Sequence, residues 1–236
     1  MPDTTKVDND DLLLRDYRPR PRLVTKATHI TQPRYPVYDA HNHLGETFGG
    51  GWINRPVAAL LDRLDEAGVR VYVDLDGGWG EDILRAHLDK IKAAAPARFR
   101  VFGGVDWRAW PERGDGFATW AAERLRAQAA WGADGLKIWK PFGLQVRNPE
   151  GAVAKIDDAR LDPIWQTAGE LGLPVLIHVA DPVAFFDPLD AANERWEELH
   201  AHPDWHFPSP PYPAFLTILE DLARLVARHP GTTFIG

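Results

Sequence analysis

Residues 36–46 read Pro36-Val-Tyr-Asp-Ala-His-Asn-His-Leu-Gly-Glu46, a short apolar strand that ends in two histidines and a carboxylate. Side chains alternate between the two faces of a strand, so we expect Asp39, His41 and His43 to share one face. Neutral imidazole is a good ligand for zinc and related divalent ions, and ligands two residues apart on a strand can reach one ion. The pattern favours a metal site at this strand end over two polar residues that merely close the strand.

Composition limits the class of protein around this stretch. The chain has 236 residues, 44% of them hydrophobic, which is enough for one domain with a sizeable core. Its formal net charge of -7 argues against nucleic acid and anionic membranes as partners. Cysteine is absent, so nitrogen and oxygen must hold any metal. With no signal peptide or transmembrane span in the sequence, we expect a cytoplasmic protein with a small-molecule substrate, and the composition leaves a homo-oligomer open.

The chain divides into a leader and a regular α/β region. Residues 1–35 are first acidic and then rich in arginine and proline, which predicts an extended N-terminal arm rather than a phosphate site. From residue 36 to 236, apolar strand patterns alternate with amphipathic helix patterns. Six strands are expected near residues 37–43, 69–75, 99–105, 135–139, 174–179 and 232–236. The connection 180–213 is long and proline-rich, and it predicts a cap-like insertion that narrows the site.

Six strands separated by crossovers long enough for right-handed βαβ units predict a parallel α/β architecture. Candidate functional side chains follow the carboxyl ends of five different strands, which favours a (β/α)8 TIM barrel over an open sheet. The candidates are His41, His43, Asp76, Asp106, Lys137, Lys140 and His178. Such a barrel typically takes about 250 residues, so we expect a barrel truncated at its C-terminus to about six strands. Its first and sixth strands should then be unpaired edges of an open, C-shaped ring.

Four segments resemble the amidohydrolase superfamily: Asp39-Ala-His-Asn-His43, Gly135-Leu-Lys-Ile-Trp139, Leu161-Asp-Pro-Ile-Trp165 and Glu170-Leu-Gly-Leu-Pro-Val-Leu-Ile-His178. The similarity is greatest to the amidohydrolase-related TIM-barrel hydrolases, a branch that includes aminocarboxymuconate-semialdehyde decarboxylase-like enzymes. The resemblance implies a divalent metal bound by His41, His43 and His178, whose ring nitrogens should converge on one point. Zinc is the ion we expect, with manganese as the alternative. It further implies a general-base aspartate, which would lie beyond residue 236.

The resemblance leads us to expect a metal-dependent hydrolase that attacks a small amide, lactone or related carboxylic substrate with a metal-activated water. A nonoxidative decarboxylase on the same scaffold is the alternative within enzymes. A non-catalytic truncated remnant that only binds a metal or a partner is the alternative of another class.

Four further residues are expected to bind the substrate: Asp106, Lys137, Trp139 and His206. Lys137 would bind a substrate carboxylate, bridge two metals if carboxylated, or pair with Asp74, Asp76 or Asp106. We favour the substrate and ion-pair roles. His206 belongs to a segment with His200 and His202, whose spacing admits a second metal site, although its aromatic and proline content favours a cap.

Overall fold

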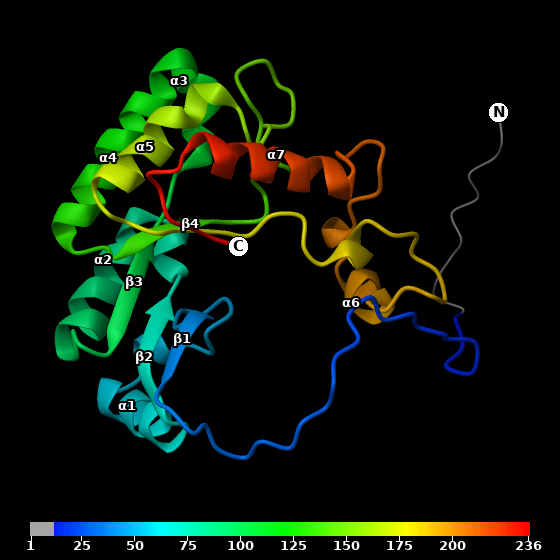
Figure 1. Ribbon diagram of the computed structural model, residues 1–236, viewed down its shortest axis with the longest axis horizontal. Coiled ribbons are helices and arrows are strands. Elements are labelled where there is room, and N and C mark those ends of the chain that lie inside the picture. Colours follow the sequence, from blue (N-terminus) through cyan, green and yellow to red (C-terminus); the bar gives the residue numbers. More distant parts are fainter. Residues whose placement is uncertain (1–11) are drawn as a thin grey trace.

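The computed structural model describes residues 12–236, and six parallel strands form its framework (Figure 1). The strands lie side by side in the order in which they occur in the sequence, and each is hydrogen-bonded in parallel to the next. Their bounds are β1 Val37–Asn42, β2 Val69–Asp74, β3 Phe99–Gly103, β4 Gly135–Ile138, β5 Val175–Ile177 and β6 Phe234–Ile235.

Helices connect the strands and cover the sheet, as a repeated βα unit requires. Their bounds are α1 Val57–Glu66, α2 Glu81–His87, α3 Trp110–Arg113, α4 Phe117–Trp131, α5 Asp162–Glu170, α6 Trp196–Ala201 and α7 Phe215–Arg228. A π-helical turn, Leu88–Lys92, continues α2. Every residue of β4 and β5 is buried, which is typical of parallel strands covered on both faces. The largest core lies between these strands and the helices α4, α5 and α7.

The sheet curls into an incomplete ring. In its strand order, β1 and β6 are the two edges, and each pairs with one neighbour only. This confirms the predicted TIM-barrel architecture with six parallel strands and an open side between the first and the sixth. Tyr38 on β1 and Ile235 on β6 are exposed at these edges. None of the helices in the described range combines the length and the apolarity needed to cross a membrane.

The strand that carries the histidine pair is less regular than its sequence predicts. Its register with β2 shifts twice, and one shift falls between Asp39 and Asn42. His41 is exposed, whereas the flanking Asp39 and Asn42 are half-buried. The expected alternation, with Asp39, His41 and His43 on one face, therefore does not continue through His41. A strand at the sheet edge has only one neighbour to hold its register, which is where such irregularities concentrate.

Residues 12–36 form an extended segment without helix or strand. The N–H groups of Arg18 and Arg20 donate to the carbonyl oxygens of Ala191 and Ala192, at 2.8 and 3.0 Å. Figure 1 shows this segment running from the insertion near α6 across the open side of the ring to β1. Only residues 1–11 of the expected arm lie outside the described range. The insertion contains α6 and buries Leu199 and Phe207, so it is a packed unit.

Candidate metal and substrate site

A buried carboxylate holds the imidazole of His43 at the end of β1. Nδ1 of His43 lies 2.8 Å from Oδ1 of Asp76, and the other oxygen accepts the N–H groups of Leu44 and Gly45 at 2.9 and 2.5 Å. Burial raises the pKa of Asp76, but these hydrogen bonds outweigh it, and the net effect is a lowered pKa. An ionised carboxylate only accepts hydrogen bonds, so the ring proton belongs on Nδ1. The lone pair on Nε2 is then free to bind a metal.

The imidazoles of His41 and His178 belong to the same electrostatic environment. The ring centroid of His41 lies 5.8 Å from that of His43. Burial, together with the charge of Lys137 and of the two other imidazoles, lowers the pKa of His41 to about 4. Burial also lowers the pKa of His178. Near pH 7, His41 and His178 are therefore neutral, which is the form that binds metals.

A backbone carbonyl fixes the tautomer of His178. Its Nε2 lies 3.0 Å from the carbonyl oxygen of Asp181, which follows in the next turn of the chain. Because a carbonyl oxygen only accepts hydrogen bonds, Nε2 donates and Nδ1 keeps its lone pair. Asp181 thus supports His178 through its main chain.

Lys137 lies in the middle of β4, and its side chain is completely buried. Among the described residues, no hydrogen-bond acceptor contacts its Nζ atom, which lies 4.9 Å from the ring centroid of Trp139. The ion pair expected with Asp74, Asp76 or Asp106 is therefore not formed. Burial lowers the pKa of Lys137 to about 8, so the amine is still mostly charged at pH 7.

A row of aromatic rings passes beside these groups. Trp139 stacks on His43 with centroids 5.4 Å apart and on Trp79 with centroids 3.9 Å apart. Phe48, from the glycine-rich loop after β1, lies 5.5 Å from His43 and 6.1 Å from Trp79. The indole of Trp139 therefore connects the histidine end of β1 with the loop after β2.

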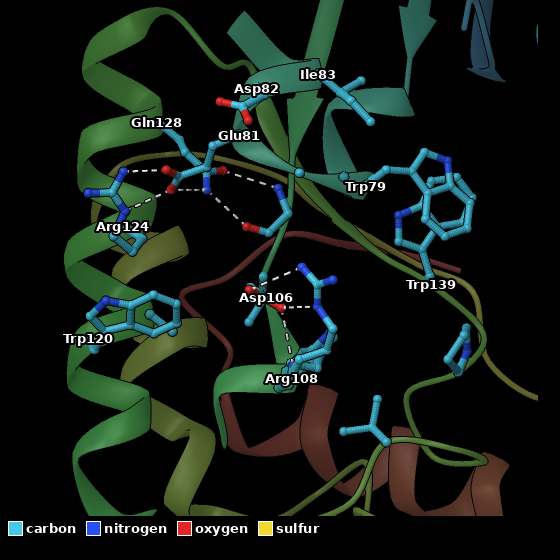
Figure 2. Close-up of a pocket in the computed structure, with 18 residues that line it drawn as sticks. Trp79, Glu81, Asp82, Ile83, Asp106, Arg108, Trp120, Arg124, Gln128 and Trp139 are labelled. Atoms are coloured by element: carbon cyan, nitrogen blue, oxygen red, sulfur yellow. Dashed lines mark hydrogen bonds and ion pairs between the residues drawn. The ribbon is translucent and has the colours of Figure 1, made fainter. Parts of the chain in front are cut away.

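Trp79 and Trp139 also line a pocket of about 760 Å³ (Figure 2). Figure 2 shows these two indoles at one wall and α4 with Trp120 and Arg124 at the other. Its lining comes from the loops after β2, β3 and β4, so the pocket opens at the carboxyl ends of the strands. This is the end where parallel barrels bind their ligands, and the volume suits a small molecule.

Several polar groups of the pocket, those of Glu81, Arg124, Gln128, Asp106 and Arg108, are paired with one another. Arg124 donates to both carboxylate oxygens of Glu81, and Gln128 bonds both to Glu81 and to the backbone N–H and carbonyl of Gly104. Asp106 accepts from Nε of Arg108 at 2.8 Å, and this hydrogen bond lowers the pKa of Asp106. Asp106 thus lies in the pocket wall, whereas His41, His43 and His178 do not line this pocket.

The three histidines of the insertion have aromatic or backbone partners. His200 stacks on Trp196, and His202 stacks on Trp205. Nε2 of His206, predicted to bind substrate, lies 2.9 Å from the carbonyl oxygen of Asp187. These histidines form no group of converging metal ligands within the described range. The insertion instead approaches the site at Lys140, whose Nζ lies 4.2 Å from the ring centroid of Phe185.

In residues 12–236, one group of three potential metal ligands can each offer one ligand atom within 4.8 Å of the other two: Asp74, Asp76 and His87. His41, His43 and His178 do not meet that distance. All three members of the compact group are buried, and Oδ2 of Asp74 lies 2.5 Å from Nδ1 of His87. Oδ1 of Asp74 accepts the N–H of Asp76 at 3.2 Å. Every carboxylate oxygen of this group therefore already has a donor.

The sequence places Asp76 among the strand-end candidates and offers it, like Asp74, only as an ion-pair partner of Lys137. It does not point to His87, Trp79 or the Glu81–Arg124 pair. The segment Asp74-Leu-Asp-Gly-Gly-Trp79, which begins at the last residue of β2, is the signal that places Asp76 and Trp79 at a strand end. The contact of His87 with Asp74 joins α2 to β2, and no local pattern encodes it.

Comparison with known proteins gives one family match. The model of a family described as amidohydrolase, Amidohydro_2, matches residues 80–236. No curated protein matches the chain.

Several solved structures are similar in fold. They include 2,6-dihydroxybenzoate decarboxylase from Rhizobium, with 20% identity, a TM-score of 0.44, and coverage of 74% of this chain and 53% of that chain. A putative amidohydrolase from Staphylococcus aureus has 17% identity, a TM-score of 0.46, and coverage of 75% and 57%. Dihydroxybenzoic acid decarboxylase from Polaromonas sp. JS666, solved with bound manganese and the inhibitor 2-nitroresorcinol, has 21% identity, a TM-score of 0.44, and coverage of 75% and 52%. The chain spans about half the length of these structures.

Proposed function

Because the chain belongs to the amidohydrolase family, we propose that it acts as a metal-dependent hydrolase on a small amide, lactone or related carboxylic compound. The observation that carries the proposal is the set of imidazoles at the carboxyl ends of β1 and β5. Asp76 engages Nδ1 of His43, and the carbonyl of Asp181 engages Nε2 of His178, so the opposite nitrogen of each ring is left for a metal. In this proposal His41, His43 and His178 would hold the metal.

The donor set suits zinc or manganese, because both accept imidazole nitrogen and the chain offers no thiolate. When bound, such an ion supplies Lewis acidity that activates water and polarises a substrate carbonyl. The lowered pKa values of His41 and His178 keep their ligating nitrogens unprotonated near pH 7. Lys137, which is mostly charged near pH 7 and has no acceptor in the described part of the chain, would add a positive charge beside the ion.

The substrate would lie across Trp139. Its carboxylate or developing oxyanion would face Lys137, while its apolar body would occupy the pocket formed with Trp79 and the loops after β3 and β4. Asp106 and His206 would act at the margins, by hydrogen bonds to polar groups of the substrate. Asp74 and Asp76 are each bonded to an imidazole, so we assign neither of them as a general base.

A nonoxidative decarboxylase is the second candidate. The observation that favours it is the cationic environment of Lys137 and Lys140. Both amines lie near His178 and would hold a substrate carboxylate, which is the group that a decarboxylase acts on. The two candidates differ in product: hydrolysis releases a new acid without gas, whereas decarboxylation releases carbon dioxide and consumes a proton.

The test is an assay of the chain with a panel of lactones, amides and aromatic carboxylates, in which acid release and carbon dioxide are measured in parallel. We expect acid release that a chelator abolishes and that zinc or manganese restores. Carbon dioxide release with the same metal dependence would select the decarboxylase. Turnover that is indifferent to the chelator would rule out both enzymes, and metal binding without any turnover would indicate a non-catalytic remnant.

A further inference from the structure

Asp76 contacts three consecutive residues at the end of β1. One oxygen faces Nδ1 of His43 at 2.8 Å, and the other accepts two backbone N–H groups from Leu44 and Gly45. A Cβ atom on Gly45 would lie 2.8 Å from Oδ2 of Asp76, so the close approach of this carboxylate depends on a glycine there. The side chain of Asp76 is 3% exposed, which shields these bonds from water.

Two contacts fix the ring of His43 in this orientation. The hydrogen bond to Asp76 places the ring proton on Nδ1 and turns Nε2 away from the carboxylate. The stacked indole of Trp139 covers one face of the ring. The carbonyl oxygen of His43 accepts a hydrogen bond from the hydroxyl of Tyr72 at 2.9 Å, which also holds the main chain of this residue.

A second layer of buried groups holds Asp76 itself. Its N–H donates to Oδ1 of Asp74, and Oδ2 of Asp74 is bonded to Nδ1 of His87 on α2. The polar chain thus runs from α2 through the end of β2 to the imidazole on β1. In this arrangement the compact group of Asp74, Asp76 and His87 uses its oxygens for internal bonds, which leaves them poorly suited to an ion of their own.

We propose that Asp76 is a positioning residue that selects the tautomer and orientation of His43 in which Nε2 binds the metal, and that Asp74 and His87 form its buried support rather than a separate ion site. This inference rests on the proposed function for the metal at His43. Outer hydrogen-bond partners of this kind typically change metal affinity about 10–100-fold when they are replaced.

The informative substitution is Asp76→Asn, because it keeps the shape of the side chain and removes its charge. With the amide oxygen still accepting the N–H groups of Leu44 and Gly45, the amide nitrogen faces His43 and donates. Nδ1 would then have to accept, which moves the ring proton to Nε2 and blocks the ligating position. Asp158→Asn is the matched control, because Asp158 also accepts a backbone N–H, that of Arg160, but touches no imidazole.

Two readouts are needed. Long-range ¹⁵N–¹H NMR of the metal-free protein reports the His43 tautomer, and competition with a chromogenic chelator reports affinity for zinc and cobalt. We expect an Nδ1–H tautomer in the wild type and an Nε2–H tautomer in Asp76→Asn. The Asp76→Asn variant should bind zinc about 10–100-fold more weakly, while Asp158→Asn stays within about threefold of the wild type.

An Nε2–H tautomer in the wild type would overturn the inference even if Asp76→Asn failed to fold. So would a folded Asp76→Asn protein with unchanged zinc affinity. His87→Gln tests the alternative ion site: a greater loss of zinc affinity in His87→Gln than in His41→Gln would place the ion on the compact group and overturn the support role. The wild type could bind no zinc while its His43 tautomer still differed from that of Asp76→Asn. The proposed function would then fail, but the orientation of His43 by Asp76 would stand.

Discussion

The ammonium of Lys137 lies 4.9 Å from the ring centroid of Trp139, and no acceptor atom of residues 12–236 contacts it. Stacking over an indole compensates a buried charge only in part, by about 2 kcal/mol or somewhat more when the pair is desolvated. Burial of an unpaired charge is otherwise costly. An anion bound beside Lys137 would offset this cost, so the site should bind anions in preference to neutral molecules.

The first prediction is that Lys137 selects anionic ligands. Benzoate should bind at least about tenfold more weakly to Lys137→Met than to the wild type, since one charge-assisted contact is worth about 1.5–3 kcal/mol. Benzamide, its neutral counterpart, should bind all variants alike. Lys92→Met is the control, because that amine is already paired with Asp134. Calorimetry measures the affinities, and equal benzoate binding by Lys137→Met and the wild type would contradict the prediction.

The second prediction concerns pH. Burial lowers the pKa of Lys137 and Lys140 to about 8, so between about pH 8 and 10 the unfolded chain binds more protons than the folded one. The free energy of unfolding should therefore rise with pH in this window, by up to about 1.4 kcal/mol per pH unit for each lysine. Lys137→Met should remove its share of the slope.

Urea denaturation at several pH values measures this slope. The series should stop near pH 9.5, because the pKa of Tyr72 is raised by burial and its ionisation in the unfolded state opposes the trend above about pH 10. A Lys137→Met protein that keeps the full wild-type slope would show that Lys137 titrates normally.

The third prediction is that Gly78 is required for the packing of the site. A Cβ atom there would lie 2.7 Å from Nε1 of Trp139 and 2.9 Å from Cβ of Lys137, both fixed in the interior. Gly78→Ala should lower the free energy of unfolding by about 1–3 kcal/mol through overpacking. Gly80→Ala is the control, because nothing lies within 4 Å of its added Cβ, and it should change stability by less than about 0.5 kcal/mol. Equal melting temperatures for the two variants would show that the interior adapts.

The fourth prediction concerns the metal. His41→Ala, His43→Ala and His178→Ala should each weaken zinc binding by at least about tenfold. Loss of a direct ligand should cost at least as much affinity as loss of an outer hydrogen-bond partner. His202→Gln, in the insertion, should bind zinc like the wild type, because its ring stacks on Trp205. Calorimetric titration with zinc measures all four. Full affinity in any of the three site variants would remove that residue from the ligand set.

The sequence by itself determined the architecture. The apolar runs at β4 and β5, the helix stripes such as Leu60 and Leu64, and the spacing between them require parallel strands joined by helices, because each of these features depends on local periodicity. The positions of His41, His43 and His178 at strand ends follow from the same local patterns. The metal assignment to these three residues remains a prediction.

Only the tertiary structure decided how the side chains meet. The register shift that exposes His41 arises because β1 is an edge strand, and the carboxylate that faces His43 comes from the turn after β2. Lys137 lacks the aspartate partner expected for it, and Asp106 pairs with Arg108 instead. Such contacts depend on the distances between elements and on the competition among several acceptors for one donor, and neither quantity is encoded in the periodicity of a single segment.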